Sequence, residues 1–267
     1  MSTTTETQQN DQYSLAKILG IWAAVAVPMP ILVYVIAPEL SLRMDMNPAI
    51  AVWLMIILGM VWQFVVSLIV LYRELGTLRW SVIRKRMWYQ TPRDPNTGAP
   101  NARLLWWALP GLALNGLVTL TPVTPFLSNI VVAVFPFLRP LYNELSQLAL
   151  DVVMTPEYVG AWWLLGLVLI SSLFNYFLGE EWLFRGVLLP KMKGVFGRWD
   201  WVANVALFGL YHLNKPWESL GIFISFLIAG WASRRYQSNW IFFIVHGVQG
   251  LIIILMTLAV VTGLAFR

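Results

Sequence analysis

Residues 160–190, GAWWLLGLVLISSLFNYFLGEEWLFRGVLLP, form an apolar stretch that decides how the rest of the chain is interpreted. The stretch exceeds the length of about 20 residues that a helix needs to cross a bilayer. Two adjacent carboxylates, Glu180 and Glu181, and the guanidinium of Arg185 interrupt it. Charged groups in hydrocarbon are costly and are as a rule paired or functional. The stretch therefore predicts a membrane-spanning helix that carries a buried polar site.

The composition extends this interpretation to the whole chain. Of the 267 residues, 58% are hydrophobic and only 12% are charged, whereas a soluble domain carries about 25% charged residues. We therefore predict an all-α, polytopic transmembrane helix bundle of about seven to eight spans, with no sizeable soluble domain. The absence of cysteine excludes disulfides, thiolate metal sites and a cysteine nucleophile.

Seven apolar segments qualify as candidate spans. They are residues 15–37, 48–72, 104–122, 160–190, 199–214, 218–233 and 239–265. A further apolar segment, 124–138, is short and contains Pro136, which interrupts a helix. We interpret it either as a re-entrant or interfacial piece or as an eighth span.

Basic residues set the expected orientation. Seven of the 18 Lys and Arg residues lie between Arg73 and Arg103, which is typical of a cytoplasmic loop under the positive-inside rule. This loop accounts for much of the net charge of +5, so we expect no nucleic-acid partner. The N-terminus is then cytoplasmic, and the first span stays as an anchor because no basic segment typical of a signal peptide precedes it. We expect a multi-pass protein in the plasma membrane of a prokaryote.

The chain divides into three predicted parts. Residues 1–13 form a polar N-terminal tail, and residues 14–158 hold the N-terminal transmembrane helices with the basic loop 73–103. Residues 159–267 form the predicted catalytic core, because they contain the acidic motif and both histidines of the chain.

The acidic motif splits into a pair and a single carboxylate. On a helix, Glu181 and Arg185 are four residues apart with the acid first, which favours an ion pair. Glu180 is rotated by about 100° from its neighbour and has no obvious local partner. A buried glutamate without a partner suits a general base, because burial favours its uptake of a proton. The pair itself could equally serve only to fix helix packing.

The two histidines lie at a depth similar to that of Glu180. Counting 1.5 Å per residue from the expected cytoplasmic helix ends puts Glu180 at roughly 15 Å, His212 at roughly 20 Å and His246 at roughly 10 Å. A single histidine in a helix bundle is more often an interhelical hydrogen-bonding residue than a ligand. The common depth of all three favours one shared site.

These residues resemble a known pattern. Glu180-Glu181-x-x-x-Arg185, followed by Phe208-x-x-x-His212 and then His246, is similar to the CPBP family of intramembrane proteases, also called type II CAAX endopeptidases or Abi proteins. The resemblance covers roughly residues 160–265. It implies an all-helical membrane fold with a conical cavity open to the cytosolic side. It also implies a peptide or protein substrate that is lipidated, such as a prenylated CAAX protein, or otherwise bound to the lipid bilayer.

The resemblance also implies catalytic roles. Glu180 would activate a water with help from His212, Glu181 and Arg185 would organise the site, and His246 would help to stabilise the oxyanion. One position departs from the family pattern, which usually has Asn or Asp four residues after the last histidine. Gly250 stands there in this chain, and Gln249, on nearly the same helix face, is the candidate replacement donor.

Two questions stay open at this stage. Glu180, His212 and His246 would make a His₂Glu set for catalytic zinc, with water as the fourth ligand; a carboxylate–histidine site can also activate water without metal, and we slightly favour that chemistry. The predicted function is an intramembrane endopeptidase that cleaves near the cytosolic membrane face. The alternatives are a non-catalytic membrane scaffold or immunity-type protein and, less favoured for want of internal repeats, a small proton-coupled carrier.

Overall fold

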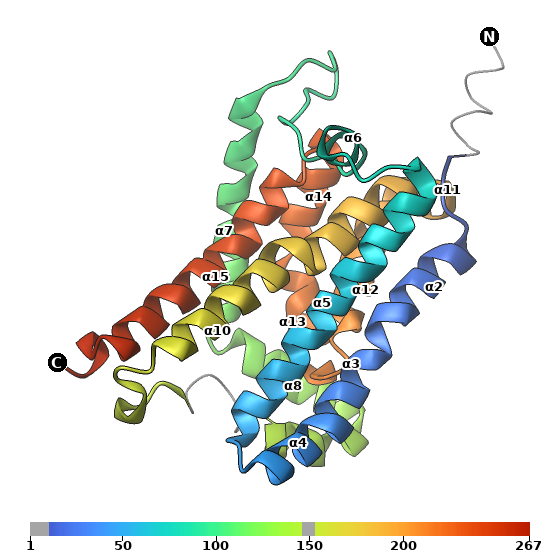
Figure 1. Ribbon diagram of the computed structural model, residues 1–267. Helices are drawn as coiled ribbons and strands as arrows, with labels where there is room; N and C mark the ends of the chain where they lie inside the picture. The colour runs from blue at the N-terminus through green and yellow to red at the C-terminus, as the bar shows by residue number, and fades with distance from the viewer. Residues whose placement is uncertain (1–10, 146–152) are drawn as a thin grey trace.

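The computed structural model describes residues 11–145 and 153–267. Most of the predicted polar tail therefore lies outside the described residues. Within the described part the secondary structure is helical, and no β-strand is formed. The predicted all-α fold is confirmed. Figure 1 shows the helices as one bundle.

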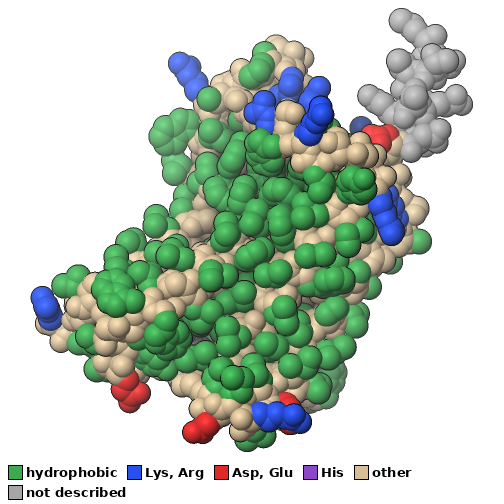
Figure 2. Space-filling view, in the orientation of Figure 1, with side chains coloured by type: hydrophobic (Ala, Val, Ile, Leu, Met, Phe, Trp, Pro, Cys, Tyr) green, Lys and Arg blue, Asp and Glu red, His purple; other side chains and the backbone are tan. Residues whose placement is uncertain are grey.

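Four helical stretches are long and apolar enough to cross a membrane. They are Leu15–Met44, Pro48–Leu75, Trp162–Lys191 and Trp240–Val261, with mean hydropathy between 1.6 and 2.6. At 1.5 Å per residue, even the shortest, with 22 residues, exceeds the hydrocarbon thickness of about 30 Å. Much of their apolar surface is exposed, as Figure 2 shows, which is the pattern expected of a surface that faces lipid. The protein is an integral membrane protein.

Capping residues mark the start of the first span and both ends of the second. The hydroxyl of Ser14 accepts a hydrogen bond from the Lys17 amide at the start of α2 (Leu15–Ala26). The side chain of Asn47 caps α5 (Pro48–Leu75), whose first residue is a proline. Gly76 ends α5 with φ of +66°, a conformation that favours glycine.

The long helices lie side by side in the order α15, α10, α5 and α2 (Figure 1), and shorter helices pack against them. Most elements are brief. The long helices α10 and α15 comprise Trp162–Leu173 and Trp240–Val261, and α10 begins the 162–191 span. The other α-helices of the described residues are α3 (Pro28–Ile31), α4 (Ala37–Met44), α6 (Trp80–Arg86), α7 (Ala108–Thr119), α8 (Val123–Val134), α9 (Arg139–Leu145), α11 (Lys193–Phe196), α12 (Asp200–Tyr211), α13 (Ser219–Ser225) and α14 (Leu227–Tyr236).

Several predicted spans are shorter or more broken than expected. The stretch Ala102–Thr119 is followed by α8 after a bend of 62°, so the segment 124–138 continues a broken span or re-entrant loop. The predicted span 199–214 contains the 12-residue α12, and 218–233 is divided between α13 and α14. Four helices meet the length and hydropathy requirements, or five with the bent pair, so the count of seven to eight spans stays a prediction.

The two ends of the bundle differ in charge. We call the end formed by residues 76–107, 191–199 and 234–239 the basic end, and the end formed by the turns 45–47, 120–122 and 212–218 the far end. Lys and Arg side chains gather at the basic end, at the top of Figure 2, whereas fewer charges of both signs lie at the far end.

A partly buried ion network ties Tyr13, just before α2, to the basic end. Arg86 on α6 pairs with Glu74 at the end of α5 and donates to the carbonyls of Gly186 and Val187 at 3.1 and 3.2 Å. The hydroxyl of Tyr13 donates to the same Glu74 carboxylate, and Lys191 lies 3.2 Å from it. The network therefore joins the start of the chain, the basic loop and the end of the 162–191 span.

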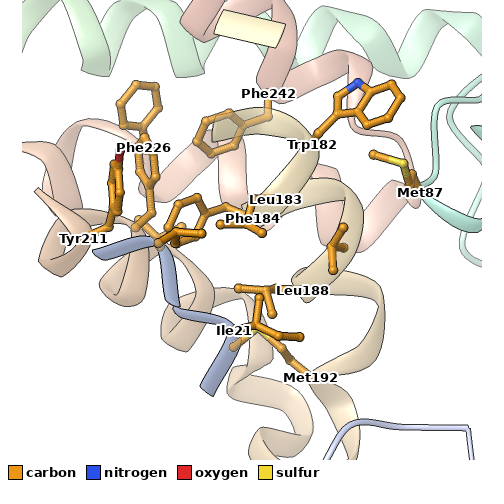
Figure 3. Close-up of a cluster of buried hydrophobic side chains, with 14 of the residues drawn as sticks. Ile21, Met87, Trp182, Leu183, Phe184, Leu188, Met192, Tyr211, Phe226 and Phe242 are labelled. Atoms are coloured by element: carbon orange, nitrogen blue, oxygen red, sulfur yellow. The ribbon is translucent and has the colours of Figure 1, made fainter. Parts of the chain in front are cut away.

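The main hydrophobic core lies beside the same span. Figure 3 shows Trp182, Leu183 and Phe184 packed among side chains from the first span and from α12, α13–α14 and α15. Because residues 181–189 are all buried, this half of the span faces protein on all sides, unlike its first half. The core thereby holds the residues around the acidic motif in one position.

Candidate active site

The acidic motif lies where the 162–191 span departs from α-helical geometry. Two π-helical segments, Phe174–Leu178 and Glu181–Leu188, flank Gly179 and Glu180. Such π-type insertions in helices are often found at functional sites. A Cβ atom at Gly179 would lie 2.5 Å from the carbonyl oxygen of Phe174 and 2.9 Å from that of Met60 on α5. Gly179 thus permits the close backbone approach that places Glu180.

We expect Gly179→Ala to displace Glu180 and to lower the free energy of unfolding by about 1–3 kcal/mol, since the added methyl meets backbone atoms that cannot rotate away. Thermal unfolding of the purified protein in detergent measures this loss. Gly166→Ala in the same span is the matched control, because its Cβ would meet nothing within 4 Å. Equal stability of the two variants would show that Gly179 is not needed for the backbone contact.

Glu180 faces both histidines, as their predicted depths indicated. Its Oε1 lies 3.8 Å from Nε2 of His212, and its Oε2 lies 3.9 Å from Nε2 of His246. The carboxylate is 4% exposed and makes no hydrogen bond with the described residues. A buried carboxylate without a partner is energetically costly, so its retention favours a chemical role.

His212 is held in one orientation by the end of α12. It is the residue that caps this helix, and its Nδ1 lies 2.9 Å from the carbonyl oxygen of Phe208. A carbonyl only accepts, so Nδ1 carries the proton and donates. The lone pair of Nε2 therefore points toward Glu180.

His246 is held by Glu181. Its Nδ1 lies 2.8 Å from Oε1 of Glu181, and both side chains are buried, at 5% and 1% exposure. A carboxylate that fixes one ring nitrogen of a histidine sets the direction of the other. Nε2 of His246 faces Glu180 as a result.

The predicted ion pair between Glu181 and Arg185 is wrong. Arg185 instead donates to Asn204 on α12, and its guanidinium stacks on Phe242 and Phe208 at 3.7 and 4.5 Å from the ring centroids. Both charged groups find partners on other helices, which a pattern within one helix cannot reveal. Arg185 is fully buried behind the acidic motif, where a cation stabilises the two neighbouring carboxylates.

The candidate oxyanion donor Gln249 is already engaged. Its Nε2 donates to Oδ1 of Asn115 on α7 at 2.9 Å, although its side chain borders the cavity described below. Gly250 has no space for a side chain, because the ring of Tyr176 occupies it. The role of Gln249 stays a prediction.

Zinc dependence stays a prediction, and the geometry lends it no support. Among residues 11–145 and 153–267, no three His, Asp or Glu side chains are arranged so that they could hold a metal ion. Glu180, His212 and His246 converge, but not as a ligand set, and we derive no step through a metal.

A cavity of about 930 Å³ reaches the site. Glu180, His212 and His246 border it, and it extends past Trp53 to Lys215 and Glu218, whose side chains are 39% and 31% exposed in the 212–218 turn. The cavity thus extends toward the far end. The basic loops and the part of the cavity bordered by Lys215 and Glu218 lie toward opposite ends, which sets the prediction of cytosolic basic loops against the prediction of a cavity open to the cytosolic side.

Several residues that support the site were not identified from the sequence. Asn204 joins α12 to Arg185 and to the carbonyl of Phe184, and Asn239 donates to the carbonyls of Arg185 and Met87. Tyr176 and Tyr211 border the cavity. The sequence did offer a signal for Asn204: an amide within an apolar helix indicates a buried polar group, and such groups require a hydrogen-bond partner.

Comparison with known proteins agrees with the location of this site. Residues 161–252 match the family described as type II CAAX prenyl endopeptidase Rce1-like. The matched region contains Glu180, Glu181, Arg185, His212 and His246. No curated protein and no solved structure showed a significant match to the chain.

Proposed function

We propose that Glu180 and His212 activate a water that hydrolyses a peptide bond within the bilayer. The match of residues 161–252 to the Rce1-like type II CAAX prenyl endopeptidase family supports a CPBP-type intramembrane protease. At the level of the family, the protein is a CAAX-type membrane protease and hydrolase. The observation that carries the finer proposal is the pair of oxygen-to-nitrogen distances, 3.8 and 3.9 Å, between Glu180 and the two histidines.

The separation of Glu180 and His212 suits one shared water. Two acceptor atoms 3.8 Å apart can both accept a hydrogen bond of about 2.8 Å from the same water. Both water protons then point to acceptors, Oε1 of Glu180 and Nε2 of His212, and a lone pair of the water oxygen is free for attack.

The reaction then uses Glu180 as the base and His246, held by Glu181, as a donor. Glu180 takes a proton as the water oxygen bonds to the carbonyl carbon, and the carbonyl oxygen becomes negative. When the carbon–nitrogen bond breaks, protonated Glu180 returns the proton to the leaving amine. Carrying a second ring proton, His246 donates from Nε2 to the negative oxygen while Glu181 accepts from Nδ1. Charge on Glu180, Glu181, Arg185 and His246 is then balanced, as a low dielectric favours.

The proposed substrate is a lipidated or membrane-bound peptide or protein. Apolar side chains such as Ile56, Val168 and Phe226 border the cavity beside its polar groups. A chain segment with an apolar anchor could therefore leave lipid without exposing that anchor to water.

The direct test is cleavage in reconstituted liposomes. We expect the wild type to cleave at least one member of a panel of membrane-anchored reporter peptides, and His212→Ala to lower kcat by about 10²-fold or more. Treatment with a zinc chelator should leave kcat within about twofold, since the proposed chemistry uses no metal. Unchanged cleavage by His212→Ala, or chelator loss that zinc restores, would contradict the mechanism.

We further propose that substrate reaches Glu180 from the far end and that the basic end is cytosolic. Because the chain has no cysteine, single cysteines report the orientation cleanly. In intact cells, Met44→Cys at the far end should react with a membrane-impermeant maleimide, and Ala99→Cys in the basic loop only after permeabilisation. The reverse result would place the cavity on the cytosolic side and overturn this orientation.

A further inference from the structure

Tyr176 fills the space in front of Gly250. A Cβ atom on Gly250 would lie 2.3 Å from Cδ2 and 2.5 Å from Cε2 of the Tyr176 ring. Such distances are not tolerated between real atoms, and an aromatic ring has no flexible end that could yield. Position 250 on α15 can therefore carry no side chain while Tyr176 keeps its place.

The same tyrosine lies against the proposed site. Its ring meets the ring of His246 edge to face, with centroids 4.8 Å apart and planes at 87°. It precedes Glu180 by four residues in the distorted span and borders the cavity together with Glu180 and His246. Tyr176 as a whole is only 8% exposed.

The hydroxyl of Tyr176 is free to donate. It makes no hydrogen bond with any residue of the described ranges, and it is not among the fully enclosed polar atoms that lack a partner. A tyrosine hydroxyl that is nearly buried normally has a partner. A ligand in the cavity would supply that partner.

Two other donors beside the site already make hydrogen bonds. The amide of Gln249 donates to Asn115, and Nδ1 of His212 donates to the Phe208 carbonyl. The hydroxyl of Tyr211 is also without a partner, but it is fully enclosed and so out of reach of a substrate. The Tyr176 hydroxyl, in contrast, has no partner among the described residues, and its ring packs against the ring of His246.

We infer that Tyr176 is a further catalytic residue: its hydroxyl donates a hydrogen bond to the negative oxygen that forms on the scissile carbonyl, next to Nε2 of His246. The inference rests on the proposed hydrolysis. The tyrosine acts as a donor only, so no bond is formed or broken on it. Preorganised donors of this kind act where charge develops in the transition state.

The experiment compares Tyr176→Phe with wild type in reconstituted liposomes and a cleaved reporter peptide. Loss of one oxyanion donor predicts a kcat lower by about 10²–10³-fold, with KM within about threefold. Tyr72→Phe, on the exposed side of α5, is the matched control and should leave kcat unchanged. A merely structural role would instead lower the amount of folded protein.

A double substitution tests whether a donor at position 250 can replace the hydroxyl of Tyr176. Tyr176→Ala opens the space at position 250, and adding Gly250→Asn places an amide donor there. We expect the double variant to cleave at least about tenfold faster than Tyr176→Ala alone, a recovery of part of the lost donor. No recovery, together with full kcat in Tyr176→Phe, would overturn the inference.

The outcomes also distinguish this inference from the function on which it rests. Glu180-dependent cleavage with normal kcat in Tyr176→Phe would overturn the role of Tyr176 alone. A large loss in Tyr211→Phe but none in Tyr176→Phe would assign the donor to Tyr211 and overturn it as well. Cleavage that does not depend on Glu180 would overturn both proposals.

Discussion

Glu180→Gln is expected to lower kcat for a reporter peptide by as much as about 10⁴-fold, the upper end of what a general base contributes. Glutamine keeps the size of the side chain but cannot take a proton from the water. Its amide would also donate toward Nε2 of His212, which lies 3.8 Å from the present Oε1, and so occupy the acceptor that orients the water. The measurement is single-turnover cleavage in liposomes.

The same substitution should leave stability unchanged or raise it. Glu180 is buried and makes no hydrogen bond with the described residues, so replacing its charge by an amide removes a desolvation cost. Thermal unfolding in detergent then separates loss of chemistry from loss of fold. Glu157→Gln, at an exposed carboxylate in the turn before α10, is the matched control and should alter neither quantity. A Glu180→Gln protein that keeps more than a tenth of wild-type kcat would rule out the proposed base.

Glu181→Gln is expected to lower kcat by about 10²–10³-fold through His246 rather than through direct contact with substrate. Glu181 accepts from Nδ1 of His246 at 2.8 Å, so it fixes the orientation of the ring. An amide at this place presents a donor as well as an acceptor, so it no longer holds the ring with Nε2 directed at the scissile carbonyl.

A spectroscopic measurement tests the effect of Glu181 on His246 without substrate. The chain has only two histidines, so ¹⁵N-histidine spectra can be assigned by comparison with His212→Ala. We expect the chemical shifts of the His246 nitrogens to change in Glu181→Gln, because Nδ1 loses its carboxylate partner, while the His212 signals stay in place because Phe208 still accepts from Nδ1. An unchanged His246 spectrum combined with normal kcat would refute the role of Glu181.

The sequence predicted the depth of the site residues in the bundle, but it did not identify the partners of the charged side chains. Rise per residue along apolar helices predicted that Glu180, His212 and His246 share one layer, and the distances of 3.8 and 3.9 Å agree. The spacing of Glu181 and Arg185 gave the wrong pair, since spacing describes neighbours on one helix only. Their actual partners, His246 and Asn204, come from α15 and α12 and depend on how helices pack.

The helix breaks and the direction of the cavity also could not be predicted from the sequence. Hydropathy predicted one span over residues 218–233, but the chain leaves helical geometry at Phe226, where no glycine or proline marks the break. The departure from α-helical geometry around Gly179 has no simple signature either. Basic residues indicate which end of the bundle is cytosolic, yet the end to which a cavity leads depends on tertiary packing.

The ion network around Arg86 bears on whether the matched region can exist as a module. The carbonyls of Gly186 and Val187, inside residues 161–252, are bound by a side chain from α6, and Gly179 packs against the backbone of α5. A fragment beginning near residue 159 would therefore lack both the donors for these carbonyls and the surface on which Glu180 is positioned. During synthesis the N-terminal helices emerge first, so this surface precedes the segment that needs it. The first half of the chain thus acts as an intramolecular template for the assembly of the second.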